Sequence, residues 1–579
     1  MMNIIRTVLA AAFAFALTAG ASAATYSANG AGAIGNSSTI GPGGDYPTLA
    51  AAATDFNSVV GGMAGNYTFF ISGDITETTT AAFGRPTNGF RLTFKPSPGT
   101  TPTITFTNLV DNNGPSGAWI IGSFDASGLD NNAVMTDVTI DGSNSIGGSS
   151  QDLLLTTTAN FLNEFPAGTP GGGFPRVLVV WGDVDNFTLK NVRIDMPVTN
   201  QFFVATRSVY AVSITSRRNA LLSLDQVPSS WTIQNCWIRS VGARQAHAIG
   251  ALNSGTITAG TCQQGYQLID NDLIGQTRGV LLNQNGAGLV ARNRMRCTQL
   301  DNAGGLVSQP FIHASSNGTT GWEMVIERNV LDQIQTSATV AGGGVTGLEL
   351  TGAPAAPGTT YTVVNNMISG FGWTHASPTP GDYVYAAVRS GSAQSVINLV
   401  HNSIHMTTQS VVNGVTNYRF GAVVFSSTNA VNDLYTTNNV IRVEGGPGNA
   451  NSAVFVKGNN NPIDSNFNVI FQGPGVTNHA WLNAGGTVYA NLAAAQAANM
   501  DLNSVNKDPL VPDAPAIGVW ISPTNLRFTA DPGPAYVGSV PALAGLSVPV
   551  DIDGQARTVQ MRGCDEQVSQ AKVGDWMIF

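Results

Sequence analysis

The residues best suited to chemistry in this chain are basic and aromatic side chains that recur at one point of a repeating strand pattern. If the strands stack in register, these side chains form one outward column, where arginine and aromatic groups would meet an anionic sugar chain. A cationic base such as Arg389 or Lys457 could there support β-elimination, whereas an ordinary solvated face would carry the same polar residues without that role. The position after the apolar core of each strand holds Asn283, His313, Thr351, Arg389, Ser426 and Lys457. With the segments that precede these strands, the candidate ligand face comprises Arg244, His247, His313, Trp373, His375, Tyr383, Arg389 and Lys457.

The carboxylates do not follow the pattern of a glycosidase. Glycoside hydrolysis needs two carboxylates about 5–10 Å apart on either side of the scissile bond. A calcium-dependent lyase needs clustered aspartates, but the aspartates of the repeat fall one per unit, at Asp270, Asp332, Asp433 and Asp464. Whether the chain is an enzyme is therefore left open, with a polysaccharide lyase as the form that catalysis would take.

No metal or cofactor site is predicted, apart from a weak indication of Ca²⁺ at a D-x-D-G turn. Asp551 and Asp553 of that turn lack the remaining ligands of an EF-hand loop, so a turn in a terminal cap is the preferred interpretation. His401 and His405 have the i, i+4 spacing of a helical metal site, but in a strand this spacing separates them by ~13 Å.

The elements that would position these residues are short strands that belong to a repeat. Alternating apolar segments end in an asparagine that precedes another apolar pair, and five of the intervals between these asparagines are 36 or 37 residues. An inward asparagine at the same bend of successive coils can donate its amide to the next and form a ladder. The predicted structural ladder comprises Asn191, Asn235, Asn271, Asn293, Asn329, Asn366, Asn402, Asn439 and Asn468.

Composition supports an all-β solenoid. Nothing in the repeat shows a sustained 3.6-residue period, and units of this length with several short strands and no helix are typical of a parallel β-helix. Only 11% of the residues are charged and the net charge is −9, which argues against a nucleic-acid partner held by a basic surface. The 4 cysteines are too few for a disulfide framework, and buried free thiols are expected.

The first 23 residues are predicted to be a secretory signal peptide. A basic start at Arg6 precedes an apolar run over 7–17, and Ala21-Ser22-Ala23 supplies the small residues of a cleavage site. The run of about 11 apolar residues is too short to span a bilayer, and no later stretch reaches the roughly 18 needed for a transmembrane helix. We therefore expect an exported protein, secreted or at the cell surface of a bacterium.

The remainder is predicted to form three regions. Residues 24–66 are an N-terminal segment and cap with a helix from Pro47 to about Asn57, residues 67–480 are the parallel β-helix, and residues 481–579 are an irregular C-terminal cap. The apolar end at 573–579 would be a last strand, or would pair with a second copy by β-addition, so self-association is left open.

Several motifs together resemble those of a known family. Gly43-Gly-Asp-Tyr-Pro-Thr-Leu49 precedes the Ala-rich helix, and Asp508-Pro-Leu510, Asp551-Ile-Asp-Gly-Gln-Ala-Arg557 and Gly563-Cys-Asp-Glu566 follow the coils. The pattern resembles the secreted bacterial right-handed parallel β-helix proteins of pectin-lyase-like fold, with Cys564 where alanine is usual. The resemblance covers nearly the whole mature chain and implies architecture far more than function, because this fold serves lyases, hydrolases, adhesins and surface components.

The sequence therefore predicts an exported, non-catalytic, structural or adhesive β-helix whose partner would be a glycan or the cell envelope. The alternative is a polysaccharide-active enzyme, a lyase before a glycoside hydrolase, acting on an acidic glycan.

Overall fold

The computed structural model of the chain describes residues 37–564 apart from a set of internal segments. Those outside the description are 59–60, 108–116, 123–133, 159–175, 198–208, 220–223, 242–245, 254–261, 277, 299–308, 317–321, 336–344, 352–358, 373–382, 391–394, 408–417, 426–432, 446–451, 459–462, 483–485, 512–519, 530–535, 537–547 and 558–561. The predicted signal peptide at 1–23 and the apolar end at 573–579 lie outside the described residues.

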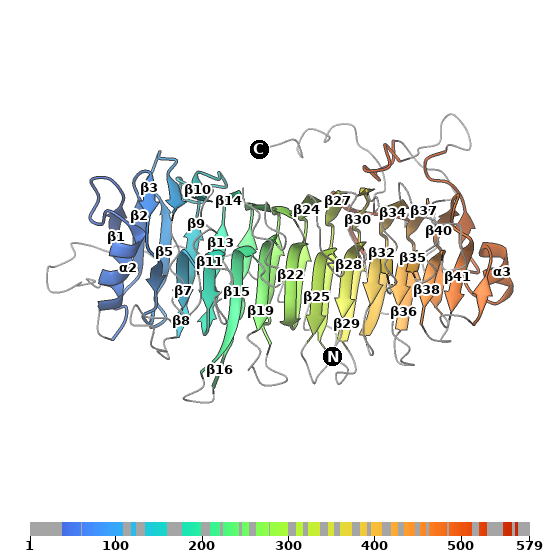
Figure 1. The fold of residues 1–579 in the computed structure, drawn as a ribbon, viewed down its shortest axis with the longest axis horizontal. Coiled ribbons are helices and arrows are strands. Elements are labelled where there is room, and N and C mark those ends of the chain that lie inside the picture. The colour runs from blue at the N-terminus through green and yellow to red at the C-terminus, as the bar shows by residue number, and fades with distance from the viewer. Residues whose placement is uncertain are drawn as a thin grey trace.

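The described strands form three long sheets, A, B and C, whose members come from successive turns of the chain (Figure 1). Sheet A contains β1 (Ser37–Ile40), β2 (Tyr67–Ile71), β5 (Leu92–Pro96), β9 (Val138–Asp141), β13 (Thr188–Lys190), β17 (Thr232–Gln234), β20 (Tyr266–Ile269), β23 (Gly288–Ala291), β26 (Glu323–Glu327), β29 (Thr359–Val364), β33 (Ser395–Val400), β36 (Asp433–Thr437) and β39 (Asp464–Asn466). Sheet B contains β3 (Ile75–Glu77), β6 (Thr103–Phe106), β10 (Leu153–Thr157), β14 (Val192–Pro197), β18 (Trp237–Val241), β21 (Asp272–Gly275), β24 (Arg294–Thr298), β27 (Val330–Gln335), β30 (Met367–Ile368), β34 (Ser403–Thr407), β37 (Val440–Glu444), β40 (Val469–Gln472) and β43 (Val505–Asn506), with β31 (Phe371–Gly372) beside β27.

Sheet C lies across the front of Figure 1. It contains β4 (Ala81–Phe83), β7 (Trp119–Gly122), β11 (Arg176–Trp181), β15 (Val209–Asn219), β19 (Ala246–Asn253), β22 (Arg278–Asn285), β25 (Gln309–Ser316), β28 (Val345–Thr351), β32 (Tyr383–Ser390), β35 (Tyr418–Phe425), β38 (Ala453–Lys457), β41 (Asn478–Leu482) and β42 (Val488–Tyr489), with β16 (Leu224–Gln226) antiparallel to β15. A separate pair joins β8 (Met135–Thr136) to β12 (Val184–Asp185).

The chain visits A, B and C in turn, and each strand pairs in parallel with its counterpart one turn later, as β14 pairs with β18 and β18 with β21. This connectivity is a right-handed parallel β-helix, as the sequence predicted. Each backbone group that a single coil leaves unpaired is thereby satisfied by the coil above or below.

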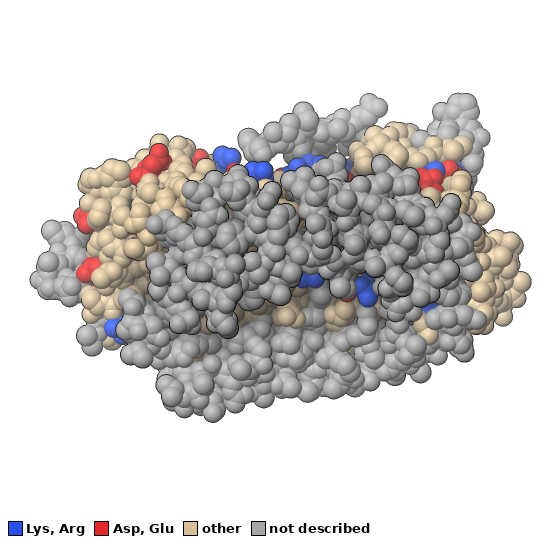
Figure 2. Space-filling model, viewed as in Figure 1, with Lys and Arg blue, Asp and Glu red and all other residues tan. Residues whose placement is uncertain are grey.

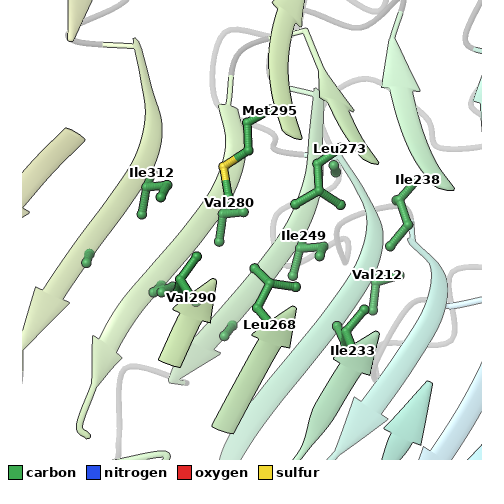
Figure 3. Close-up of a cluster of buried hydrophobic side chains, with 14 of the residues drawn as sticks. Val212, Ile233, Ile238, Ile249, Leu268, Leu273, Val280, Val290, Met295 and Ile312 are labelled. Carbon is green, nitrogen blue, oxygen red and sulfur yellow. The ribbon is translucent and has the colours of Figure 1, made fainter. Parts of the chain in front are cut away.

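The core is a column of apolar side chains contributed by all three sheets; it is aliphatic in the middle of the stack (Figure 3) and largely aromatic in the N-terminal coils. In one coil these are Val212 of sheet C, Ile233 of sheet A and Ile238 of sheet B, all 0% exposed. Full burial of one such side chain is worth about 1.5–3 kcal/mol, so the stack is held mainly by repeated small apolar contributions.

A helix lies at the N-terminal end, close to its predicted position. Helix α2 (Leu49–Ser58) buries Leu49, Ala52 and Phe56 in the core, and the Phe56 ring lies 5.6 Å from that of Phe83 in the first coil. Strand β1 precedes this helix in the chain and pairs in parallel with β2, so the parallel pairing begins upstream of Tyr67.

The C-terminal region does more than close the end of the stack. After the short helix α3 (Leu492–Ala497) and β43, described segments between 508 and 564 lie along sheet B. Trp520, Phe528 and Ile552 bury apolar residues of sheet B such as Val440. At the bend between sheets A and B, backbone carbonyls of this region accept bonds from coil residues, for example that of Val550 from Asn365 Nδ2 at 2.6 Å.

Among the described helices, none has the length and apolar character needed to cross a membrane.

Candidate functional site

The polar residues on the outer face of sheet C form two columns, and their register differs from the predicted one. Backbone pairing places Glu349 opposite both His313 and Arg389, whereas Thr351 pairs with Ser315. A register shift lies between Leu282 and Asn285 of β22. Alignment of apolar runs cannot detect such an irregularity, because one extra residue leaves the apolar pattern intact while it moves every following side chain.

Lys457 does not belong to this face. It pairs with Phe425 on one side and Leu482 on the other, both of which are core residues, and its own side chain is 0% exposed. Its place at the end of β38 puts it in the inward row, so the expected base at Lys457 has no access to a ligand on the outer surface.

Four consecutive strands contribute a stacked row that begins with Arg176. Tyr210 lies opposite Arg176, His247 opposite Tyr210, and Arg278 opposite His247. The Arg176 guanidinium carbon is 6.0 Å from the Tyr210 ring centre, and the Tyr210 and His247 rings stack at 5.0 Å. Gly250 makes this arrangement possible, since a Cβ there would lie 2.4 Å from Cδ1 of Tyr210.

The second column contains an ion pair, with Arg389 Nη1 3.3 Å from Glu349 Oε1. The sheet C strands given above contain two carboxylates, Glu349 in β28 and Asp225 in the antiparallel strand β16.

The arginines of this face are partly removed from water. Burial lowers the pKa of Arg176 to about 10, against a smaller opposing effect of Tyr210. Burial also lowers the pKa of Arg278, and the Glu349 charge partly compensates. The Nε atoms of Arg278 and Arg389 are buried and make no hydrogen bond within the described part of the chain. A desolvated cation with an unused donor is a strong point of attachment for an anion.

In the view of Figure 1, basic side chains are visible at the middle of this face, in front of β22 to β32 and between residues that are not described (Figure 2).

The remaining members of the predicted ligand face are only partly placed. Arg244, Trp373 and His375 lie outside the described residues. His313 lies in β25 between Leu281 and Glu349, and Tyr383 lies in β32 opposite Tyr418; the structure places both by backbone register alone.

Sequence reasoning missed Arg176, Tyr210, Arg278 and Glu349. A signal for three of them exists, because each precedes a small or β-branched residue and then an aliphatic one, as in Arg176-Val-Leu, Tyr210-Ala-Val and Arg278-Gly-Val. His247-Ala-Ile follows the same pattern. Glu349 has no such signal, because it stands inside an apolar strand.

The asparagines at the bend between sheets A and B form two stacks. In the longer stack, each side-chain Nδ2 donates to the Oδ1 of the next at 2.9–3.1 Å, and the residue before each asparagine has a positive φ. Its members are Asn271, Asn293, Asn329, Asn366, Asn402, Asn439 and Asn468.

Asn191 and Asn235 lie one residue earlier in their coils and bond to each other at 2.8 Å. Both occupy the positive-φ position, and Cys236 takes the place of the ladder asparagine, with its N–H donating to Asn271 Oδ1 at 2.9 Å. The predicted column therefore divides, because asparagine suits the left-handed backbone position as well as the ladder position.

The D-x-D-G turn is occupied by contacts within the protein. Asp551 Oδ1 accepts hydrogen bonds from the N–H groups of Asp553 and Gln555, and Asp553 pairs with Arg527 through two nitrogens at 2.8 and 3.1 Å. Among the described residues, no group of three or more His, Cys, Asp or Glu side chains has the arrangement of a metal site. The four cysteines are buried thiols, and none of them forms a disulfide.

The strand pairing and the bend stacks define the class, which is a right-handed parallel β-helix with a basic and aromatic row on the outer face of one sheet. Comparison with described protein families gave no match, and none of the curated proteins is similar.

Solved structures with some similarity include two polysaccharide epimerases and an adhesin. The periplasmic alginate epimerase AlgG is 9% identical, with 62% of this chain and 77% of that one covered at a TM-score of 0.25. PfbA, a surface adhesin of Streptococcus pneumoniae, is 12% identical, with 75% of this chain and 89% of that one covered at a TM-score of 0.31. The A-module of the mannuronan C-5 epimerase AlgE6 of Azotobacter vinelandii is 12% identical, with 66% of this chain and 94% of that one covered at a TM-score of 0.14. Similarity at this level says nothing about activity, and the fold assignment rests on the strand pairing.

Proposed function

We propose that this protein is an exported, non-catalytic β-helix that binds an anionic glycan on the outer face of sheet C, as an adhesive or structural component of a cell surface. The signal-like residues 1–23 support export, and a rod held by inter-coil bonds along its length suits an extracellular setting.

The observation that carries the proposal is the pair of buried, unused Nε donors on Arg278 and Arg389. These arginines come from strands three positions apart in sheet C, which is ~14 Å at the usual strand spacing. Two cations at least this far apart would contact different carboxylates or sulfates of one polymer. The Arg176–Tyr210–His247 row is buried beneath this face, so it would support the site without touching the glycan.

A lyase is the second candidate. Its support is Arg389 alone, since Lys457, the other expected cationic base, lies in the core row. Elimination would require the neutral guanidine of Arg389 to take a proton from the sugar carbon next to the carboxylate while another cation neutralises that carboxylate. The electron pair of the C–H bond would form the C=C bond, and the bond to the glycosidic oxygen would break, with that oxygen leaving as an alcohol after it takes a proton from water.

One experiment tests both candidates. Residues 24–579 would be passed over immobilised sodium alginate, polygalacturonate and hyaluronate, with dextran as the neutral control, while the ultraviolet absorbance of unsaturated uronates is monitored in parallel. We expect retention on at least one anionic polymer, a loss of at least about tenfold in affinity for Arg278→Ala and for Arg389→Ala, and weakening by salt.

Arg239→Ala is the matched control, because Arg239 is an arginine of sheet B that pairs with Asp195 at 3.2 Å. Equal retention on dextran, or full binding by both sheet C variants, would contradict the proposal. An unsaturated product that Arg389→Ala abolishes would establish the lyase instead.

A further inference from the structure

We propose that Glu349 is an internal occupant of the anion-binding position. On this view its carboxylate holds Arg389 and opposes a glycan carboxylate, so that it weakens glycan binding rather than contributing to it. The inference rests on the proposed glycan-binding function and concerns the regulation of that same site.

The Glu349–Arg389 contact is looser than other ion pairs of this protein. Arg389 uses one nitrogen at 3.3 Å, and its Nε atom makes no hydrogen bond within the described chain. In contrast, Arg292 donates two hydrogen bonds to the carboxylate of Asp270, from Nε at 2.7 Å and from Nη2 at 2.8 Å. The bidentate form of this interaction is the stronger one. The single contact with Glu349 therefore holds Arg389 in place but leaves the Nε edge of its guanidinium group able to donate a hydrogen bond to a ligand.

The position of Glu349 in the sheet favours a role as a stand-in for a ligand. It lies directly opposite Arg389 in β32, and its negative charge also acts on Arg278 in β22. Within the described part of the chain, the charge of this one carboxylate therefore acts on two arginines. A glycan carboxylate that approached Arg389 would have to displace Glu349 and would be repelled by it.

The opposite role for Glu349 makes an opposite prediction. If Glu349 bonded to sugar hydroxyls or acted as an acid or base, removal of its charge would weaken binding or turnover. If Glu349 occupies the anion position, removal of its charge should strengthen binding.

The test compares Glu349→Gln with wild-type protein for binding to sodium alginate and polygalacturonate, measured by retention and by titration calorimetry. Glutamine keeps the shape of glutamate and removes one negative charge. We expect affinity for the polymer that wild-type protein binds to rise about three- to tenfold, the scale of one partly screened charge contact. The double variant Glu349→Gln/Arg389→Ala should bind no better than Arg389→Ala.

Glu323→Gln is the matched control, because Glu323 lies in β26 of sheet A, where it accepts a hydrogen bond from Thr362 Oγ1 at 2.7 Å. We expect its affinity to equal that of wild-type protein. Should Glu349→Gln melt at a lower temperature, Glu349→Asp provides a second test, since the shorter side chain withdraws the charge from Arg389 and should tighten binding by less.

The outcomes separate the two proposals. Unchanged or weaker binding by a folded Glu349→Gln, together with loss of binding by Arg389→Ala, would overturn the inference and leave the glycan site standing. No retention of wild-type protein on any anionic polymer would overturn the proposed function itself.

Discussion

Removal of one asparagine from the middle of the ladder should be among the most destabilising single changes in this protein. The Asn366 side chain takes part in five hydrogen bonds. Its Oδ1 accepts from the backbone N–H and the Nδ2 of Asn329 at 2.9 and 3.0 Å. Its Nδ2 donates to the carbonyls of Ile326 and Val364 at 2.8 and 3.0 Å, and to Asn402 Oδ1 at 3.0 Å.

The magnitude follows from these bonds. Because the Nδ2 group has two hydrogens for its three acceptors, about four full hydrogen bonds are lost, and at about 1 kcal/mol net for each, Asn366→Ala should lower the free energy of unfolding by about 4 kcal/mol. The Asn329 N–H would be left without an acceptor in a fully buried site, which works in the same direction. Because coils contact only their neighbours, the loss should concentrate in the coils next to Asn366.

Asn235→Gly is the control. The Asn235 side chain makes bonds of 2.8 Å to the Ser149 carbonyl and to Asn191 Oδ1 in a less buried place, and glycine tolerates its positive φ. We expect a loss of about 1 kcal/mol there. Urea unfolding followed by circular dichroism measures both variants, and hydrogen exchange of the Asn329 and Asn366 amides locates the damage. A loss at Asn366 that does not exceed the loss at Asn235 would refute the ladder as a source of stability.

Three further predictions concern the site and the C-terminal region. Gly250→Ala would place a Cβ 2.4 Å from Cδ1 of the buried Tyr210 ring, so it should lower the free energy of unfolding by about 1–3 kcal/mol in urea titrations; unchanged stability would show that the row is not tightly packed. Burial alone would raise the pKa of Asp501, but the hydrogen bond to His479 and the charge of His479 make the folded-state pKa lower than the usual value. The ionised Asp501 therefore stabilises the fold above the unfolded pKa of about 3.9, and this stabilisation is lost as the pH falls through the folded pKa. The stability difference between wild-type protein and Asp501→Asn should therefore shrink as pH falls below about 4 in urea titrations, and a difference that grows would contradict the assignment. Trp520→Ala should cost about 3–5 kcal/mol of local stability and let a protease cleave the C-terminal region while the coils persist; uniform loss of all the coils would show that this region is not a separate layer.

The fold could be predicted from the sequence because the residues that recur once per coil, above all asparagine, have a specific structural role at the bend. Asparagine before an apolar pair at intervals of 36 or 37 residues, as at Asn329, Asn366 and Asn402, reflects a bend that recurs in every coil. The helix near 47–57 was equally readable, because its apolar residues Leu49, Ala52 and Phe56 have helical spacing.

The site could be predicted only in part, because its geometry depends on register. The sequence placed His247 in a loop before a strand and aligned Arg389 with Lys457, whereas backbone pairing places His247 and Arg389 within strands of sheet C. Whether a residue of a short strand faces the core or the solvent changes with a shift of one position, and that shift is set by backbone pairing between coils. Glu349 could not be found at all, because only pairing across β28 and β32 shows that it faces an arginine.

The sequence by itself determined the architecture, the place of the N-terminal helix and the side chains available for bends, since these depend on local periodicity and residue type. Only the tertiary structure shows which polar residues share the outer face of sheet C, that Lys457 lies in the inward row, and that the described part of the C-terminal region lies along sheet B. The physical reason is that a parallel β-helix brings together residues about one coil apart, and the pairing of whole coils, rather than any local preference, fixes their register.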